Sequence, residues 1–452
     1  MLPQAFIDKY QKLLGSQAAD LFKALTAGET KKAFRVNSLK AVSPQTVDLQ
    51  TPVPGLMQAF YGQVHDTSSD WVSGTVYSQE PAAMFPAAVS GVQPGERVLD
   101  LCAAPGGKST ALAEKLRGQG LLVANEMNAK RAKILRENLE RWGATNVVIT
   151  NASPDQLATH FQEYFDCIVV DAPCSGEGMF RKDPVAMDYW SPDYVQTCQD
   201  RQKQILQSAL QMLKPGGRLV YSTCTFSPEE DEQIAEWLLE QGLQIKPLQL
   251  TAGQPGRPDW TASQNPVLAD TVRFWPQDGV GEGQYLAMFT RPGAPASVQI
   301  KRRKQKRQPG LSKADQEVVK QALDNFILPA TWQLNWRNLQ NRHGHVVAPV
   351  LSDERLQGLH VLSNGVELGQ LKPHRFIPSQ QLAQVLGGAK QTQVLALHDE
   401  ASFKAYLHGE TIKTTSSLRG YVLVSYHDQI FSFGKIGNDQ ILKNFYPKGL
   451  RH

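Results

Sequence analysis

Two cysteines stand directly after segments that predict β-strands, a position from which a thiol can reach a pocket. Cys174 lies in DAPCSG, downstream of the apolar run FDCIVV, and Cys224 ends the run GRLVYSTC. Neighbouring strands lie about 4.8 Å apart, so adjacency of these two strands would bring both thiols to one pocket. A thiolate is a strong nucleophile, and a covalent adduct divides one difficult step into easier ones. Collapse of the adduct needs a second group near the substrate, and the other thiol can supply it.

A glycine turn upstream predicts where a cofactor binds. The stretch VLDLCAAPGGKST reads as a strand, a turn and the start of a helix, with Asp100 near the strand end. Small residues in the turn let a ligand approach the backbone closely. Ser109 is placed to cap the helix, whose N-terminus favours an anionic group. We therefore expect the ligand in the crevice beyond the carboxyl ends of the strands.

The next two predicted strands indicate which cofactor this is. LLVANE ends in Glu126, twenty residues past Gly106, where an acidic residue binds ribose hydroxyls in nucleotide-binding sheets. NVVIT is followed by Asn151, which is placed to meet an adenine edge. The turn lacks the GxGxxG motif of NAD-binding proteins, which disfavours NAD. It also lacks the GxxxxGK[ST] motif of P-loop proteins, which disfavours nucleotide hydrolysis. The combination favours S-adenosylmethionine.

Thiols beside such a cofactor suit methylation of a cytosine. Carbon 5 of cytosine is a poor nucleophile, and addition of a thiolate to carbon 6 lets carbon 5 attack a sulfonium methyl group. Asp171, three residues before Cys174, is placed to stabilise the adduct at N3. Lys108, in the glycine turn, is placed to lower the pKa of a thiol. The base has to leave its stack to enter the pocket.

Strand and helix patterns alternate from residue 96 onward, which predicts an α/β fold with helices on both faces of a Rossmann-like sheet. The chain has 452 residues, enough for roughly three domains. Earlier residues mix amphipathic helix with short extended pieces, and late segments such as GYVLVSYH are short and β-like. The predicted parts are a small α+β domain for RNA positioning (1–75), a catalytic domain (76–292), a basic linker (293–312), an α+β subdomain (313–385) and a β-rich RNA-binding domain (386–452).

Charge and aromatic residues indicate where RNA binds. A net charge of +4 is weak evidence for nucleic acid. The run KRRKQKR (301–307) places six cations in seven residues, which suits a solvated tether that also contacts phosphates. The final stretch GKIGNDQILKNFYPKGLRH mixes cations with Phe and Tyr. It predicts a stacking and phosphate-binding face, with a core aromatic pair beside surface lysines as the alternative.

Of the other cysteines, Cys167 and Cys198 are expected to pack as small apolar side chains, and Cys102, in the turn, to pack against the backbone near the cofactor. Irregular spacing and the absence of a CxxC pair disfavour zinc and a disulfide framework, so we expect no metal. The start MLPQAFIDKYQKLLG lacks the basic start and continuous apolar run of a signal peptide. No stretch approaches the roughly 20 apolar residues of a membrane span. We expect a cytoplasmic, monomeric protein that has no membrane partner.

The chain closely resembles the Nol/Nop/Sun group of RNA (cytosine-5) methyltransferases. The matching stretches are RVNSLK (35–40), DLCAAPGGKST (100–110), DAPCSGEGMFRKDP (171–184), MLKPGGRLVYSTCTFSPEED (212–231) and FYPKGLR (445–451). The layout resembles the bacterial RsmF-like ribosomal RNA enzymes, which carry a C-terminal PUA-like module. The resemblance implies a fold of this class, S-adenosyl-L-methionine as cofactor and RNA as partner, with small-subunit ribosomal RNA expected before transfer RNA.

The resemblance also implies roles for individual residues. Cys224 corresponds to the nucleophile on carbon 6, Cys174 to the cysteine that assists release, and Asp171 to an aspartate between base and cofactor. Asn151 departs from the usual aspartate, which puts the strength of the adenine contact in doubt. The implied cofactor residues are Cys102, Ala103, Ala104, Pro105, Gly106, Gly107, Lys108, Glu126, Arg131, Asn151 and Asp171. The implied RNA contacts are Arg35, Asn37, Arg181, Lys182, Lys443 and Lys448, with a surface salt-bridge cluster as the alternative for the 181–183 stretch.

Two other functions fit part of this pattern. A DNA cytosine-5 methyltransferase would use the Pro-Cys cysteine, Cys174, as nucleophile, but such enzymes lack the second cysteine at Cys224. A non-catalytic RNA-binding or ribosome-assembly factor on the same scaffold would have lost catalytic residues. The chain instead retains Asp171, both cysteines and the cofactor turn.

Overall fold

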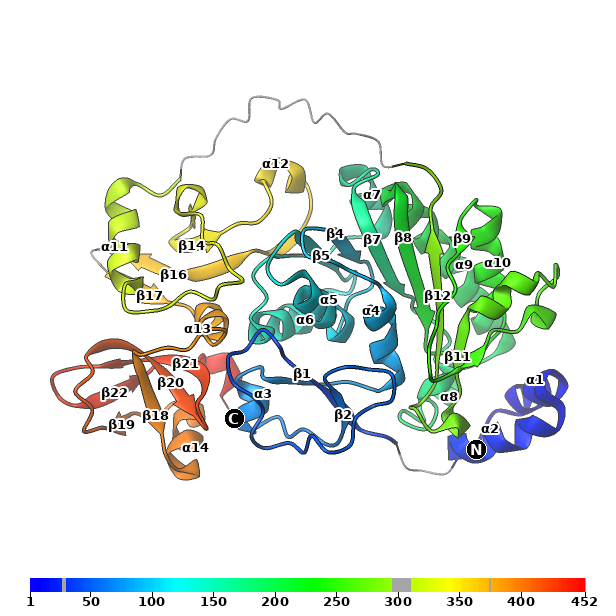
Figure 1. Ribbon diagram of the computed structural model, residues 1–452, viewed down its shortest axis with the longest axis horizontal. Coiled ribbons are helices and arrows are strands. Elements are labelled where there is room, and N and C mark those ends of the chain that lie inside the picture. The colour runs from blue at the N-terminus through cyan, green and yellow to red at the C-terminus, as the bar shows by residue number, and fades with distance from the viewer. Residues whose placement is uncertain (27–29, 295–309, 374, 452) are drawn as a thin grey trace.

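A mixed ten-stranded sheet forms the centre of the molecule (Figure 1). The computed structural model describes residues 1–26, 30–294, 310–373 and 375–451. The strands of this sheet are β4 (Arg97–Asp100), β5 (Leu121–Asn125), β6 (Val147–Thr150), β7 (Phe165–Asp171), β8 (Leu213–Thr223), β9 (Gln244–Ile245), β10 (Gln254–Pro255), β11 (Val272–Phe274), β12 (Gln284–Thr290) and β15 (Val361–Asn364). Five of them are parallel, in the order β8–β7–β4–β5–β6. Antiparallel strands extend the sheet beyond β8 and beyond β6.

Helices cover both faces of the sheet. Successive strand residues point to opposite faces, and because both sets are apolar, both faces are buried. Val98, Val169 and Val220 pack on one face, and their neighbours Leu99 and Ile168 pack on the other. The first face is covered by α4 (Phe85–Val89), α5 (Gly107–Leu116) and α6 (Ala129–Trp142). The second is covered by α7 (Pro154–His160), α9 (Pro192–Met212) and α10 (Glu232–Glu240). The predicted α/β class with a Rossmann-like sheet is confirmed.

The strand order reverses at β4, which has β5 on one side and β7 on the other. In open α/β sheets the ligand crevice lies at such a point, outside the carboxyl ends of the strands. The glycine turn follows β4 directly and leads into α5. The fold therefore puts the predicted cofactor turn at the same edge of the sheet as the two loops that carry Cys174 and Cys224, which we call the catalytic loops.

The N-terminal region consists of a helical pair and a small sheet. The helices are α1 (Gln4–Leu14) and α2 (Ala18–Thr26), joined by the short helix η1 (Gly15–Gln17). The strands β1 (Ala33–Val36), β2 (Ala59–Tyr61) and β3 (Val76–Ser78) form a sheet in the order β2–β1–β3, with helices α3 (Ser69–Val72) and η2 (Ala82–Met84) beside it. Phe6 and Leu21 of the helical pair pack against Phe180, Trp190 and Phe226, so this pair rests on the catalytic loops.

Two further sheets form the C-terminal region (Figure 1). The first contains β13 (Gln340–Arg342), β14 (His345–Ala348), β16 (Val366–Lys372) and β17 (Arg375–Pro378), with helices α11 (Lys313–Leu323), η7 (Trp336–Asn338), α12 (Asp353–Leu356) and α13 (Gln380–Leu386). The second contains β18 (Val394–Leu397), β19 (Ile412–Lys413), β20 (Gly420–Tyr426), β21 (Gln429–Ile436) and β22 (Ile441–Asn444), with helices α14 (Glu400–His408) and η8 (Lys448–Leu450). Leu382, Leu423 and Phe433 belong to one core that joins the two sheets.

Strand pairing and packing cross the predicted domain borders. β15 lies within the predicted subdomain 313–385, yet it pairs with β6 at the edge of the central sheet, with Val361 opposite Thr150. Val72 of the N-terminal region packs into the core of the last sheet. Most of the predicted linker, 295–309 with its KRRKQKR run, lies outside the described residues. Within the described ranges, no helix is long and apolar enough to cross a membrane.

Candidate active site

The two predicted catalytic thiols meet at the carboxyl ends of adjacent strands. β7 and β8 are parallel neighbours, and Asp171 pairs with Ser222 in register. Cys174 follows β7 by three residues, and Cys224 follows β8 directly. Their sulfur atoms are 3.3 Å apart. Both residues are partly exposed, so the pair is open to a substrate.

The pair is electrostatically asymmetric. The hydrogen bond with Cys224 is the largest cause that raises the pKa of the Cys174 thiol well above its ordinary value. Burial raises this pKa further. Cys174 therefore keeps its proton at neutral pH, and it can donate that proton toward the sulfur of Cys224.

Asp171 is held by three donors beside the thiols. Its Oδ2 accepts a hydrogen bond of 2.6 Å from Lys108 Nζ. Its Oδ1 accepts from Ser222 Oγ at 2.6 Å and from Gln284 Nε2 at 3.1 Å. The ammonium group of Lys108 thus contacts Asp171 directly, whereas the sequence placed it next to a thiol. Lys108 orients the carboxylate, and this contact is the role that the geometry supports.

The cofactor turn contains a buried carboxyl with a free oxygen. Ser109 Oγ donates a 2.6 Å hydrogen bond to Asp100 Oδ2, while Asp100 Oδ1 is buried without a hydrogen-bond partner in the described part of the chain. Burial raises the pKa of Asp100 to about 7. The prediction that Ser109 caps α5 is wrong, because the cap position is Gly106, with φ of 119°. Ser109 lies inside the helix and holds Asp100 instead.

The second glycine of the turn is required by close packing. A Cβ atom on Gly107 would lie 2.8 Å from Gln79 Cδ. Gln79 Oε1 in turn accepts a 2.9 Å hydrogen bond from Arg35 Nε. A side chain at this position would displace the Gln79 amide from its contact with Arg35.

Glu126 and Arg131 lie next to the turn, as the sequence predicts for cofactor residues. Glu126 is buried and accepts a 2.8 Å hydrogen bond from the backbone N–H of Asn128. Arg131 Nη1 is 3.4 Å from Glu126 Oε2, and its Nη2 donates to the carbonyl of Ala104 at 2.6 Å. Arg131 therefore connects the acidic residue after β5 to the turn after β4.

Asn151 has protein partners for its whole amide group. Its Nδ2 donates to the carbonyls of Glu126 and Met127, both at 2.8 Å, and its Oδ1 lies 3.1 Å from His360 Nδ1. Its backbone N–H donates to the carbonyl of His360 at 2.9 Å. Asn151 thus joins the end of β6 to the start of β15. This surrounding favours a structural contact in place of the predicted contact with adenine.

Two of the predicted RNA contacts are buried in the protein. Arg35 Nη2 donates to the carbonyl of Gly107 at 2.7 Å, and its guanidinium lies over the Trp142 ring. Asn37 Nδ2 donates to the carbonyls of Gly74 and Trp142 at 2.8 and 2.9 Å. Their fixed, buried positions correct the prediction, because they attach the N-terminal sheet to the catalytic domain and leave no group for RNA.

Arg181 is also internal, whereas the predicted lysines are exposed. Arg181 Nε pairs with Glu282 at 2.7 Å, and both side chains are buried. This pair matches the salt-bridge alternative rather than an RNA contact, although it lies inside the protein and not on its surface. Lys182, Lys443 and Lys448 are exposed and remain predicted RNA contacts.

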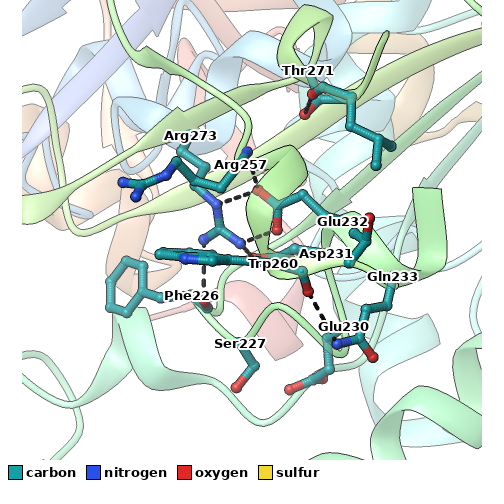
Figure 2. A network of polar contacts seen from close by, with 12 residues as sticks. Phe226, Ser227, Glu230, Asp231, Glu232, Gln233, Arg257, Trp260, Thr271 and Arg273 are labelled. Atoms are coloured by element: carbon teal, nitrogen blue, oxygen red, sulfur yellow. Dashed lines mark hydrogen bonds and ion pairs between the residues drawn. The ribbon is translucent and has the colours of Figure 1, made fainter. Parts of the chain in front are cut away.

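A buried ionic network fixes the loop after Cys224 (Figure 2). Arg273 is 1% exposed, and its Nε donates to Glu232 Oε1 at 2.6 Å. Its Nη2 lies 3.1 Å from Asp231 Oδ2, and its Nη1 donates to the carbonyl of Phe226 at 3.0 Å. The ring of Trp260 covers the guanidinium at 4.8 Å. A buried charge is tolerated when it is paired and hydrogen-bonded in this way.

Sequence reasoning missed two buried carboxyls behind the thiols. Glu177 and Glu230 are fully buried and bond to the residues that follow the two cysteines. The signal available in the sequence was proximity, since Glu177 lies three residues after Cys174 and Glu230 six residues after Cys224.

The sheet order, the turn after β4 and the residues at the strand ends define a Rossmann-like methyltransferase. Comparison with known proteins gives the family. Models match in chain order for the N-terminal domain of 16S rRNA methyltransferase RsmF (2–81), 16S rRNA methyltransferase RsmB/F (87–290), the RsmF rRNA methyltransferase first C-terminal domain (325–386) and the methyltransferase RsmF PUA domain (393–452). The chain belongs to the RsmF-like family of rRNA methyltransferases.

Relatives support this assignment, one of them over 99% of this chain. The chain is 28% identical to ribosomal RNA small subunit methyltransferase F of Escherichia fergusonii, over 99% of this chain and 96% of the relative. It is 38% identical to the protein of the same name from Cronobacter sakazakii over 275 residues, 56% of this chain and 57% of the relative. A solved methyltransferase homolog protein from Pyrococcus horikoshii superimposes with a TM-score of 0.55 at 29% identity, covering 63% of this chain and 94% of that one.

Proposed function

We propose that this protein methylates carbon 5 of cytosine in 16S ribosomal RNA, with S-adenosyl-L-methionine as methyl donor. The observation that carries the proposal is the 3.3 Å pair of Cys174 and Cys224 at the ends of adjacent strands, beside Asp171. Membership of an rRNA methyltransferase family supports the substrate class.

The residues around the glycine turn suit the cofactor. Asp100 Oδ1 is a buried acceptor without a partner among the described residues, which suits a cationic amino group. Glu126, after the second strand, is placed for ribose hydroxyls. Arg131 holds the turn by donating to the carbonyl of Ala104. When bound, S-adenosylmethionine supplies an electrophilic methyl group.

Cys224 is the nucleophile and Cys174 the proton carrier in this proposal. The Cys224 thiolate adds to carbon 6, and the electron pair of the 5,6 double bond moves so that carbon 5 can form its bond to the methyl carbon. Cys174 begins as a thiol, because the hydrogen bond with Cys224 raises its pKa. Once the Cys224 sulfur is bonded to carbon 6, it is a weaker hydrogen-bond partner. The pKa of Cys174 then falls, and Cys174 can release its proton to solvent.

Release of the product then uses the Cys174 thiolate as a base. It takes the proton from carbon 5, the electron pair restores the 5,6 double bond, and Cys224 leaves as a thiolate. Asp171 lies at the same edge of the sheet, and Lys108 and Ser222 hold its carboxylate in place to meet the N3 edge of the base. The hydrogen bond with Cys224 raises the pKa of Cys174, which favours this order over attack by Cys174.

RNA binding outside the pocket is assigned to exposed cations. Lys443 and Lys448 are exposed in the region that matches the PUA domain model, and Lys182 is exposed beside the catalytic loops. Phosphate contacts of this kind position RNA without reading its sequence. The base itself enters the pocket unstacked.

Bisulfite sequencing of cellular RNA with and without this protein tests the proposal. We expect loss of 5-methylcytosine at one or more positions of 16S ribosomal RNA when the gene is deleted, and restoration by the wild-type protein. If 5-methylcytosine were lost from transfer RNA alone, the substrate would be transfer RNA and not 16S ribosomal RNA. Unchanged 5-methylcytosine in all RNA would overturn the proposed activity.

A further inference from the structure

The residues that follow the two cysteines are bonded to each other. Ser175 Oγ and Thr225 Oγ1 are 2.8 Å apart, and both residues are buried. Cys174 and Cys224 are each one residue away, so this contact brings the two thiol-bearing loops together at the point where the sulfurs meet.

A buried carboxyl holds each of these hydroxyls. Glu230 accepts the backbone N–H of Ser175 at 3.0 Å through Oε2 and contacts Ser175 Oγ through Oε1. Thr225 Oγ1 donates to Glu177 Oε2 at 2.9 Å. We call the chain Glu230–Ser175–Thr225–Glu177 the thiol clamp. It runs from one catalytic loop to the other through three hydrogen-bond contacts.

The two hydroxyl groups of the thiol clamp supply fewer protons than its hydrogen bonds need. It contains three contacts between oxygen atoms, and each needs one proton. Ser175 and Thr225 contribute one hydroxyl proton each. The third proton has to come from one of the two carboxyls, because a carboxylate has none to donate.

Glu177 is the carboxyl with the larger set of hydrogen-bond donors. Besides Thr225 it accepts from Tyr10 OH at 2.6 Å, Ser227 Oγ at 2.7 Å, and Trp190 Nε1 and the backbone N–H of Phe226 at 2.9 Å. Each of these contacts brings a donor to Glu177, so the third proton of the thiol clamp is assigned to Glu230.

Glu230 has fewer donors and more surrounding negative charge. Gln202 Nε2 donates to its Oε2 at 2.8 Å, in addition to the contacts with Ser175. The ionisable groups facing it are Glu177, Asp231, Cys174, Cys198 and Tyr221. Arg273 pairs with Asp231 and Glu232 rather than with Glu230. Burial, followed among the raising causes by the charge of Glu177, raises the pKa of Glu230 to about 7.

We propose that Glu230 is a positioning residue that carries a proton in the resting enzyme, and that this proton completes the thiol clamp and keeps Cys174 and Cys224 in register. The reaction that it serves is the one proposed above, whereas the protonation itself does not depend on that reaction. Loss of the proton leaves one contact of the thiol clamp without a hydrogen. The resulting charge also raises the pKa of Cys174. Both effects oppose turnover as the pH rises through about 7.

Glu230→Gln separates this role from simple packing. The amide oxygen can take the place of Oε2 and accept from Ser175 N–H and Gln202, while the amide nitrogen donates to Ser175 Oγ. This variant therefore imitates the protonated acid at every pH. Glu229→Gln is the matched control, because Glu229 lies next in the chain and pairs with Lys9 near the surface.

Infrared difference spectra test the proton directly. Wild type minus Glu230→Gln should show the carbonyl stretch of a protonated carboxyl at about pH 6, and this band should vanish at about pH 9. Wild type minus Glu229→Gln should show no such band. Absence of the band in the Glu230 difference spectrum at about pH 6 would overturn the proposal, whether or not the protein methylates RNA.

The pH profile of single-turnover methylation tests the positioning role. One pH unit above its pKa, about a tenth of a carboxyl population is protonated. Above the pKa of Glu230, the ratio of the wild-type rate to the Glu230→Gln rate should thus fall about tenfold for each pH unit. The rate of Glu229→Gln should show the same pH dependence as wild type. A constant ratio of the wild-type and Glu230→Gln rates would overturn the positioning role. If wild type fails to methylate RNA while the infrared band is present, the proposed function fails and the protonation stands.

Discussion

The hydroxyl of Tyr10 donates a 2.6 Å hydrogen bond to the carboxylate of Glu177, between residues 167 positions apart in the chain. Tyr10 belongs to α1 of the N-terminal helical pair, and Glu177 lies three residues after Cys174. Since Glu177 also accepts from Thr225, a single buried carboxylate connects the N-terminal helices to both catalytic loops. The helical pair is therefore part of the support of the active site.

Tyr10→Phe should lower the free energy of unfolding by about 1–3 kcal/mol, because the buried carboxylate loses one of its donors. Urea unfolding followed by circular dichroism measures this change. The rate of methylation should fall with it, since the support of Thr225 is loosened. Tyr189→Phe is the control, because Tyr189 is exposed, and it should unfold like wild type. Equal stability of the two variants would contradict the role given to the Tyr10 contact.

Cys224→Ala should abolish methyl transfer to RNA and leave cofactor binding unchanged, because the nucleophile is lost while the glycine turn lies on another strand. Transfer of a radiolabelled methyl group measures the first effect, and calorimetric titration with S-adenosylmethionine measures the second. Turnover within about tenfold of wild type would show that Cys224 is not the nucleophile.

Cys174→Ala should leave RNA attached to the protein, because addition proceeds and release fails. A denaturing gel should show a protein–RNA complex that is absent for the Cys174→Ala/Cys224→Ala double variant, which lacks the attacking sulfur. If the single variant forms no such complex, and wild type forms none with RNA that carries a fluorinated cytosine, the covalent mechanism is wrong.

Much of this site follows from the sequence, because it depends on regular strands. A strand that ends at Asp171 and another that ends at Thr223 put Cys174 and Cys224 at one edge as soon as the strands are neighbours. The turn after β4 and Glu126 after β5 follow in the same way. Periodicity and strand ends are local signals, and they determine which side chains reach the carboxyl edge of the sheet.

The parts that the sequence did not predict depend on contacts between distant segments. Ser175 and Glu230 are 55 residues apart, and the N-terminal Arg35 meets Gly107 across 72 residues. A positively charged residue in RVNSLK suggests a phosphate contact, but Tyr77 and Trp142 enclose it in the protein. Similarly, the residues next to Asn151 in the sequence do not indicate that the chain near β15 brings His360 to its amide. Burial of a polar residue is decided by the partner segment, which the residue's own neighbours do not reveal.

Asp100→Asn should weaken cofactor binding by about tenfold or more, because a carboxylate that can pair with a cationic amino group becomes a neutral amide. The pKa of Asp100 is raised to about 7, so the wild-type carboxyl favours folding when protonated and opposes it when ionised. Without cofactor, wild-type stability should therefore decline as the pH rises from about 4 to about 7, and Asp100→Asn should lack this part of the decline. Urea unfolding across this pH range, together with calorimetric titration, measures both effects. Unchanged cofactor affinity would remove Asp100 from the cofactor site.

Arg273→Met should lower the free energy of unfolding by about 3–5 kcal/mol, because Asp231 and Glu232 would remain buried without their cation. Arg257→Met is the matched control from the same network (Figure 2), since Arg257 pairs with the exposed Asp259 at 3.3 Å, and an exposed pair is worth at most about 1 kcal/mol. Urea unfolding of both variants measures the difference. Because Arg273 also holds the carbonyl of Phe226, two residues after Cys224, the methylation rate should fall in Arg273→Met at temperatures where the protein is still folded. Equal stability of the two variants would show that the buried carboxyls become protonated at little cost, and that the ionic network does not fix the loop of the nucleophile.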